Sequence, residues 1–284
     1  MLCLIVRKNL DLLDLVMINM FSIAKHVLLW YYKNRKGGRM KCILLCAGYA
    51  TRLFPLTENF PKALLEIEEG KPLLDYILDE VNSVSVIDEI YVVTNDRYAS
   101  HFEKWANLKN NPKKITVIND HTTNNDDRLG AIGDIKFTMD TMNIDDDTII
   151  IAGDNLFDYK LNDVINFYNK HKKPVAVTKV IDDINLLKRF AVATLDESDR
   201  IIELVEKPEE PKSNVGVYAT YIYPRDVMKD INKYLSEGNN PDAPGYFLEY
   251  VVKHHDTYAY KFIGNCYDVG THDSLKLVRE LYNK

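Results

Sequence analysis

Apolar and polar positions alternate along most of the chain in a way that predicts strands and helices in turn. From Met40 onward, short apolar runs of strand length are followed by longer segments with helical periodicity. The strands expected in this part are Cys42–Cys46, Glu89–Thr94, Ile115–Ile118 and Thr148–Ala152, and the helices are Gly70–Asn82, Tyr98–Leu108 and one beginning near Arg128. Strands that alternate with helices usually pair in parallel, so this part predicts a mostly parallel sheet with helices on both faces.

The pattern changes after about residue 160, where strands follow one another more closely. The strands expected there, some of them antiparallel, are Val175–Val180, Phe190–Leu195, Ile201–Val205, Val215–Tyr223 and Tyr258–Ile263. Helices are expected over Pro224–Leu235 and Tyr246–His254, and again after Thr271. The fold class predicted is therefore α/β: a Rossmann-like, mixed but mostly parallel sheet with a smaller antiparallel part.

Residues 1–39 do not follow this rhythm. The apolar stretch Leu10–Tyr32 is interrupted by polar and charged residues and lacks a small-residue cleavage site, which disfavours both a membrane span and a signal peptide. One interpretation is an amphipathic surface helix. The preferred one is that Met40 is the natural start, because Lys36–Arg39 could be encoded by a purine-rich stretch resembling a ribosome-binding site. We expect residues 40–284 to form a single domain.

Composition narrows the classes of partner. The 284 residues are 46% hydrophobic and 27% charged, which is enough for a full core, and the formal net charge of −6 argues against nucleic acid as the main partner. The 4 cysteines include no C-x-x-C pair. Cys42 and Cys46 are expected as buried apolar residues in a reducing cytoplasm, with no membrane association.

The turn after the first expected strand carries the first candidate chemistry. Gly48 and Ala50 let backbone N–H groups approach a ligand, and Thr51 adds a hydroxyl donor. Arg52 and Lys62 bring two cations toward the same place. Bare amides beside two cations suit a polyphosphate, although a solvent loop with ordinary surface cations would explain a motif this short. No GK[ST] follows the glycine, which excludes a Walker P-loop.

This stretch resembles the signature of the sugar-phosphate nucleotidyltransferases, a strand followed by G-x-G-T-R and later by P-K. Gly48, Thr51, Arg52 and Pro61-Lys62 fall on the pattern, but Ala50 replaces its second glycine. If that position needs φ > 0, the alanine costs about 1 kcal/mol.

Three further motifs match the same family. Gly153-Asp154-Asn155 is similar to its metal-binding G-D-N, and Asp268 lies in a segment similar to its D-x-G-T. Glu206-Lys207-Pro208 is similar to its E-K-P, in which the lysine grips the acceptor phosphate and the glutamate reaches sugar hydroxyls. The base-reading segment departs most, because relatives often have a glutamine and then G-L-A where this chain has Arg128–Gly133. The nucleobase therefore cannot be named from the sequence.

The resemblance implies a site on specific residues. Its catalytic residues would be Arg52, Lys62 and Asp154, and Asp154 and Asp268 would hold Mg²⁺. The nucleotide-binding residues it implies are Ala47, Gly48, Tyr49, Ala50, Thr51, Arg52, Lys62 and Gly130. The acceptor-binding residues it implies are Glu206, Lys207, Asn214, Gly216 and Glu249.

The activity implied is transfer of a nucleotidyl group from a nucleoside triphosphate to a sugar 1-phosphate, with release of pyrophosphate. Two alternatives remain open. One is a cytidylyltransferase acting on a non-sugar phosphate such as phosphocholine or a phosphorylated amide, which the segment Arg189–Ala191 leaves room for because many relatives have a glycine there. The other is a non-catalytic relative that senses nucleotide or sugar phosphate. The sequence leaves self-association into a homo-oligomer undecided.

Overall fold

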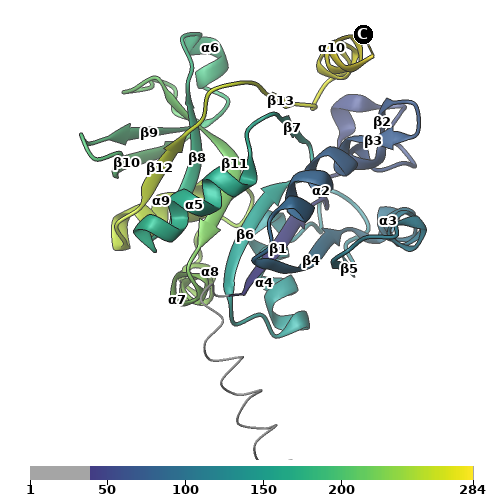
Figure 1. The fold of residues 1–284 in the computed structure, drawn as a ribbon, viewed down its shortest axis with the longest axis horizontal. Coiled ribbons are helices and arrows are strands. Elements are labelled where there is room, and N and C mark those ends of the chain that lie inside the picture. The colour runs from purple at the N-terminus through teal and green to yellow at the C-terminus, as the bar shows by residue number, and fades with distance from the viewer. Residues whose placement is uncertain (1–38, 284) are drawn as a thin grey trace, which may run out of the picture. The chain divides into compact units, whose positions relative to one another are not determined.

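The structure, a computed structural model, describes residues 39–283, which belong to one compact unit (Figure 1). The interpretations of residues 1–38 lie outside the described residues. None of the helices found between residues 39 and 283 has the length and apolar character needed to cross a bilayer.

A nine-stranded mixed sheet forms the centre of this unit, as predicted. Strand β1 (Met40–Leu45) lies between β6 (Asp147–Ala152) and β4 (Ile87–Thr94), and β5 (Lys114–Asn119) lies beyond β4; all four run parallel. The register places Leu45 beside Ala152 on one side and Val93 on the other. The carboxyl ends of these strands therefore meet at one edge of the sheet.

The second part of the sheet is antiparallel, which also confirms the prediction. Strand β11 (Val215–Tyr223) pairs with β6, β8 (Val175–Val180) and β9 (Ala191–Leu195), and β10 (Ile201–Glu206) pairs with β9. Strand β12 (Tyr258–Lys261) pairs in parallel with β8.

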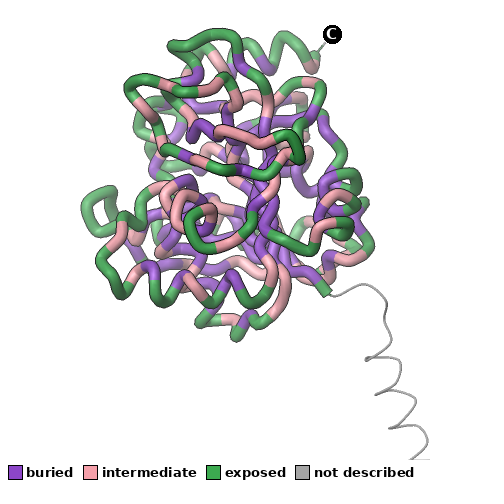
Figure 2. Tube along the Cα trace, turned by 90° about the vertical axis from the view of Figure 1, so that its left-hand side faces the viewer, coloured by how far each residue is buried: buried purple, intermediate pink, exposed green. Residues whose placement is uncertain are grey.

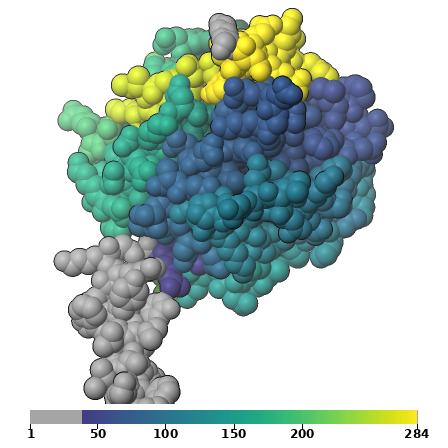
Figure 3. All heavy atoms as spheres, turned by 45° about the vertical axis from the view of Figure 1, so that its right-hand side comes forward, coloured from purple at the N-terminus to yellow at the C-terminus, as the bar shows by residue number. Residues whose placement is uncertain are grey.

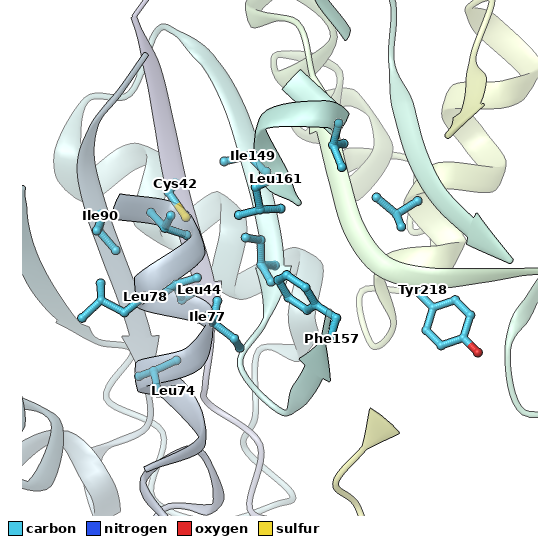
Figure 4. Packing of buried hydrophobic residues seen from close by; sticks show 14 of the residues in the cluster. Cys42, Leu44, Leu74, Ile77, Leu78, Ile90, Ile149, Phe157, Leu161 and Tyr218 are labelled. Atoms are coloured by element: carbon cyan, nitrogen blue, oxygen red, sulfur yellow. The ribbon is translucent and has the colours of Figure 1, made fainter. Parts of the chain in front are cut away.

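Helices cover both faces of the sheet, because successive side chains of each strand point to opposite faces. Cys42 and Leu44 of β1 pack with one buried cluster, whereas Ile43 belongs to the other. Figure 4 shows the first cluster, where Leu74, Ile77 and Leu78 of a helix lie against β1. Figure 2 shows the buried strands at the centre and the exposed positions around them. The first face is covered by α2 (Leu73–Ser83), α3 (Asp96–Leu108) and α5 (Leu161–His171), and the second by α4 (Gly130–Met142), α8 (Asp230–Ser236) and α9 (Pro244–His254).

Several predicted boundaries were wrong by a few residues. The helix expected from Gly70 begins at Leu73, because Lys71–Pro72 (β3) pairs instead with Glu66–Glu68 (β2). The helix expected over Pro224–Leu235 is divided at Lys229 into α7 (Arg225–Met228) and α8. The short helix α6 (Ile184–Leu187) was not predicted.

The sequence pattern also missed a pairing between two three-residue strands. Strand β7 (Asn155–Phe157) follows β6 directly, and β13 (Cys266–Asp268) pairs with it antiparallel, with Asp268 opposite Asn155. Three residues are too few to show a period, so this pairing leaves no signal in the sequence. It joins parts of the chain more than a hundred residues apart.

The last helix, α10 (His272–Tyr282), closes the fold next to this pairing. Leu275 of α10 packs with Leu53 and Leu156 in a third buried cluster, and Arg279 donates to the carbonyl of Glu66 at 2.9 Å. In Figure 3 this C-terminal segment (yellow) lies against the segment that follows β1 (purple to blue). The end of the described chain thus holds the loop after β1 in place.

We expect Gly153→Ala to lower the free energy of unfolding by about 1–3 kcal/mol, because the added methyl overpacks a tight contact. A Cβ at Gly153 would collide with Cys46 Sγ and lie 3.1 Å from the carbonyl oxygen of Leu45. Gly48→Ala is the matched control, since no atom lies within 4 Å of a Cβ there. Urea unfolding of both variants measures the difference.

Adding Cys46→Ala to Gly153→Ala should recover part of the lost stability, because it removes the colliding sulfur. Equal stability of the two glycine variants would contradict the close contact between β1 and β6.

Candidate functional site

A cavity of about 460 Å³ opens at the carboxyl ends of β1 and β6, where Leu45 and Ala152 line it. Ligands in open α/β sheets commonly bind at this edge. The cavity is lined by these residues named in the sequence prediction: Ala47, Gly48, Tyr49, Arg52, Gly130, Asp154, Glu206, Lys207 and Asp268.

The turn after β1 has a positive φ at position 50, the case in which the sequence predicts a cost for alanine. Ala50 adopts φ 48° and ψ 41°, in the left-handed region where a glycine would be unstrained. The Thr57 hydroxyl donates to the carbonyl of Ala50 at 2.8 Å. The buried Tyr98 hydroxyl donates to the carbonyl of Thr57 at 2.6 Å and lies 3.2 Å from the carbonyl of Tyr49. Side chains of the folded protein therefore hold the turn in the shape that the missing glycine would adopt freely.

Lys62 and Asp154 form an ion pair beside this turn. Lys62 begins the short helix η2 (Lys62–Leu64), and its Nζ lies 2.6 Å from Asp154 Oδ2. The two side chains are 15% and 33% exposed, so the pair is partly shielded from solvent. Although Lys62 does not line the cavity itself, it contacts a residue that does.

The β7–β13 pairing brings Asp268 next to Asp154. The backbone N–H of Val269 donates to the carbonyl of Asp154 at 3.0 Å. A Cβ at Gly270 would lie 3.0 Å from Arg52 Nη2 and 3.1 Å from Asp268 Oδ1, so both side chains approach the space that this glycine leaves open. Arg189 approaches Asp268 at 3.9 Å.

Burial raises the pKa of Asp268, and the negative charge of Asp154 raises it further. The cations Lys62, Arg52 and Arg189 oppose this rise. The two carboxylates thus repel each other within a ring of cations, an arrangement that a bound divalent cation would relieve.

The donor set fits a magnesium ion that shares its ligands with substrate. Within residues 39–283, no three His, Cys, Asp or Glu side chains gather closely enough to hold a metal ion by themselves. Mg²⁺ commonly takes one or two carboxylates and completes its shell with phosphate oxygens and water. Asp154 and Asp268 therefore suffice for such an ion, whereas they would make a poor site for a metal held by protein alone.

Glu206 and Lys207 line another wall of the cavity at the end of β10. The Glu206 side chain is only 6% exposed, because it lies against Gly245 in the first turn of α9, where a Cβ would collide with its carboxylate. Lys207 Nζ lies 3.3 Å from Glu206 Oε1. Burial raises the pKa of Glu206, and the charge of Lys207 lowers it in part. Lys207 is 56% exposed, so its ammonium remains available to a ligand.

Three residues predicted to contact the acceptor do not line the cavity. Strand β11 lines the cavity through its alternate residues Val217, Ala219 and Tyr221. Gly216 lies one position out of phase with them and faces Ile181 instead. Asn214 is exposed, and Glu249 Oε1 pairs with Lys253 Nζ at 2.8 Å. Ala50 and Thr51 also lie outside the lining. The ligand contacts expected of these residues stay predictions.

The sequence interpretation missed two acidic residues that line the cavity. Asp120 follows β5 directly, and Asp134 lies on the buried face of α4, one turn after Gly130. Each is only 6% exposed. The available signal was Asp134 itself, an acidic residue among the apolar positions Ile132 and Ile135 of a helix. Asn125 and Arg128 line the cavity nearby, and Arg128 Nη2 pairs with Asp242 Oδ1 at 3.0 Å.

Comparison with known proteins relates this chain to one family. A family model described as nucleotidyl transferase matches residues 41–284. The chain is 32% identical over 232 residues to the bifunctional protein GlmU of Methanocaldococcus jannaschii, covering 81% of this chain and 51% of that protein. It is 27% identical over 184 residues to the UTP–glucose-1-phosphate uridylyltransferase AglF of Haloferax volcanii, covering 65% of this chain and 72% of that protein.

The chain spans about half the length of the GlmU relative. Among solved structures, UDP-glucose pyrophosphorylase complexed with UDP-glucose superposes with a TM-score of 0.74 at 20% identity, covering 86% of this chain and 98% of that one. This likeness confirms the predicted fold class.

We expect Asp134→Asn to stabilise the protein increasingly as the pH rises from 5 to 7. Burial and the nearby charge of Asp120 raise the pKa of Asp134 from 3.8 to about 8. Between these values the folded protein keeps a proton that the unfolded chain has released, so the wild type loses stability with rising pH. The amide cannot titrate, so its advantage should grow by at most about 1.4 kcal/mol per pH unit.

Urea unfolding at pH 5, 6 and 7 measures this difference. Asp140→Asn, an exposed position on the same helix, is the control and should give a difference that does not change with pH. A flat difference for Asp134→Asn as well would show that Asp134 titrates normally.

Proposed function

The chain belongs to the nucleotidyl transferase family, and we propose that it joins a nucleoside triphosphate to the phosphate of a sugar 1-phosphate and releases pyrophosphate. One observation carries this proposal: the cations Arg52 and Lys62, the carboxylates Asp154 and Asp268, and the pair Glu206–Lys207 all lie in or against one cavity. Separate strand ends supply the groups that two phosphorylated substrates need.

We place the triphosphate at the turn after β1. Residues 47–49 line the cavity, and no atom lies within 4 Å of a Cβ placed on Gly48. Arg52 provides a fixed fork of donors for phosphate oxygens. Lys62 would be shared between Asp154 and the phosphates, because the ammonium has three donors. We propose the predicted nucleotide-binding residues, 47–52 with Lys62 and Gly130, for this role.

We place the acceptor at the wall formed by Glu206 and Lys207. Lys207 would hold the acceptor phosphate against its repulsion from the triphosphate, and the Glu206 carboxylate would accept hydrogen bonds from hydroxyl groups. Arg189 also lines this part and is 54% exposed, so it can add a second cation. Asn214, Gly216 and Glu249 would act less directly, as supports of this wall.

We infer that Asp154 and Asp268 hold Mg²⁺ together with substrate phosphate oxygens. When bound, the ion would neutralise phosphate charge and polarise the phosphoryl group that is attacked. Lys62 already compensates one of the two carboxylates, which lowers their mutual repulsion when the ion is absent.

The reaction needs no covalent enzyme intermediate. An oxygen of the acceptor phosphate attacks the α-phosphorus in line, and a new P–O bond forms as the bond to the β-phosphate bridging oxygen breaks. Arg52 would stabilise the charge that develops on the leaving pyrophosphate, and the other residues act by positioning. Cys46 is unsuited as a nucleophile, since burial raises the pKa of its thiol.

We place the reaction in the cytoplasm. Within the described residues, Cys42, Cys46 and Cys266 are free thiols, which a reducing compartment maintains.

The test is pyrophosphate release by the full chain with Mg²⁺, with each nucleoside triphosphate crossed against a panel of acceptors. The panel contains hexose 1-phosphates, phosphocholine and other phosphorylated small molecules. Release that requires one nucleotide and one sugar 1-phosphate, and that EDTA abolishes, is the expected result. Release with phosphocholine alone would favour the cytidylyltransferase alternative. Nucleotide binding without release from any acceptor would favour a sensing role.

We expect Asp154→Asn to reduce turnover by about a hundred- to a thousandfold, because the amide removes one of the two charges that face the phosphates. The fold should remain intact, since Asp154 is at the surface of the cavity and not in the core. Asp163→Asn, an exposed position on α5, is the matched control. Cooperative unfolding with unchanged activity in Asp154→Asn would rule out its role as a metal ligand.

A further inference from the structure

A short chain of buried hydrogen bonds holds the turn after β1 from the protein interior. The Tyr98 hydroxyl donates to the carbonyl of Thr57 at 2.6 Å, and the Thr57 hydroxyl donates to the carbonyl of Ala50 at 2.8 Å. Asn95 Nδ2 donates to the carbonyl of Ala47 at 2.8 Å. Thr57, Asn95 and Tyr98 are each 0% exposed, so water does not compete for these bonds. Both ends of the turn are therefore fixed through their carbonyl groups.

The N–H groups of the same turn are not used by the described protein. No N–H group of residues 47–52 donates a hydrogen bond to another described residue. In a trans peptide the carbonyl and the following N–H point in opposite directions. The Gly48 N–H therefore points away from Asn95, and the Thr51 N–H points away from Thr57. Gly48 is exposed and lines the cavity, so these donors lie on the open side of the turn.

The conformation that directs these donors is one that Ala50 does not favour. Its φ of 48° lies in the left-handed region, where the Cβ of an L-residue is crowded. Ala50 precedes the short helix η1 (Thr51–Leu53), so its backbone also sets the direction in which Arg52 leaves the turn. The carbonyl of Ala50 accepts from Leu53 within that helix and from the Thr57 hydroxyl, which anchors it to the interior. Without this anchor the turn would relax toward negative φ, and both the amides and the guanidinium would shift.

We propose that Thr57, with Tyr98 behind it, is a positioning residue for the triphosphate. Neither side chain lines the cavity, so neither acts by touching substrate. Thr57 holds Ala50 in the left-handed conformation, and Tyr98 holds Thr57. The turn thus has its binding conformation before the nucleotide arrives, and binding energy is not spent on reshaping it. This inference rests on the proposed function, since it assumes that the turn after β1 takes the triphosphate.

The first measurement is equilibrium binding of CTP, GTP, ATP, UTP and dTTP to the full chain with Mg²⁺, by calorimetry and without any acceptor. The tightest of the five is then measured with Thr57→Val, which removes the hydroxyl and keeps a side chain of similar shape. Its affinity should fall about five- to thirtyfold, because relaxation of a strained alanine lowers the fraction of protein with a binding-competent turn by that factor. Thr57→Ser keeps the hydroxyl and should recover most of the affinity.

The same comparison in the Ala50→Gly background tests whether strain at Ala50 is the cause. Glycine adopts positive φ about as readily as negative φ, so the turn no longer needs to be held. Adding Thr57→Val to Ala50→Gly should therefore weaken nucleotide binding about threefold or less. A general loss of stability caused by Thr57→Val would be the same in both backgrounds, so the difference between the two ratios isolates the positioning role.

Tyr98→Phe tests the same chain of bonds without altering Thr57. It should also weaken nucleotide binding, and Ala50→Gly should again reduce the effect; this variant decides the outcome if Thr57→Val does not unfold cooperatively. Tyr168→Phe is the matched control. It removes a buried hydroxyl that donates to Asp147 Oδ2 at 2.5 Å, at the end of β6 far from the cavity, and should leave nucleotide affinity unchanged.

The outcomes separate this inference from the proposed function. Unchanged nucleotide affinity in both Thr57→Val and Tyr98→Phe would overturn the positioning role and leave the proposed function standing. Equal losses of affinity with and without Ala50→Gly would also overturn it, because the hydrogen bonds would then act independently of the strain at Ala50. If none of the five nucleotides binds the wild-type chain, the proposed function fails and the inference fails with it.

Discussion

The parallel pairing of β1 with β6 is the constraint on which the site depends. It places Leu45 beside Ala152, so the turn at 47–52 and the Gly153–Asn155 segment leave the sheet side by side. The contact is close enough that Gly153 has no room for a side chain next to Cys46. Because β1 and β6 are almost wholly buried, with helices on both faces, this geometry cannot shift without disturbing both halves of the core.

Cations stand beside the acidic groups of the cavity, although the whole chain carries a net negative charge. The protein has a net charge of −6, and a polyphosphate ligand would be repelled by a wall of uncompensated carboxylates. Each acidic group at the phosphate and acceptor walls has a cation close to it: Lys62 beside Asp154, Arg52 and Arg189 beside Asp268, and Lys207 beside Glu206. Asp120 and Asp134 are the contrast within the described cavity, because burial raises the pKa of both carboxyls.

Much of this arrangement was predictable from local sequence. Buried parallel strands such as β6 are continuous apolar runs, and each was located within one or two residues. Arg52, Asp154, Lys207 and Asp268 were identified because they lie in short motifs that resemble those of a known family. Gly216 and Glu249 show the limit of such motifs: a segment can match while its side chains point elsewhere, since a strand exposes alternate residues and Glu249 pairs with Lys253 on its own helix.

The sequence by itself determined the order of the main strands and helices, because this follows from hydrophobic periodicity. It also set the condition on Ala50 through local backbone chemistry, and its resemblance to a family marked the cations and carboxylates at the strand ends. Only the tertiary structure decided that β7 pairs with β13 and that Asp120 and Asp134 line one cavity. The first pairing involves three residues on each side, and the second joins a loop to a helix by burial alone. Contacts of this kind form only when distant segments are brought together by the core, so no local pattern records them.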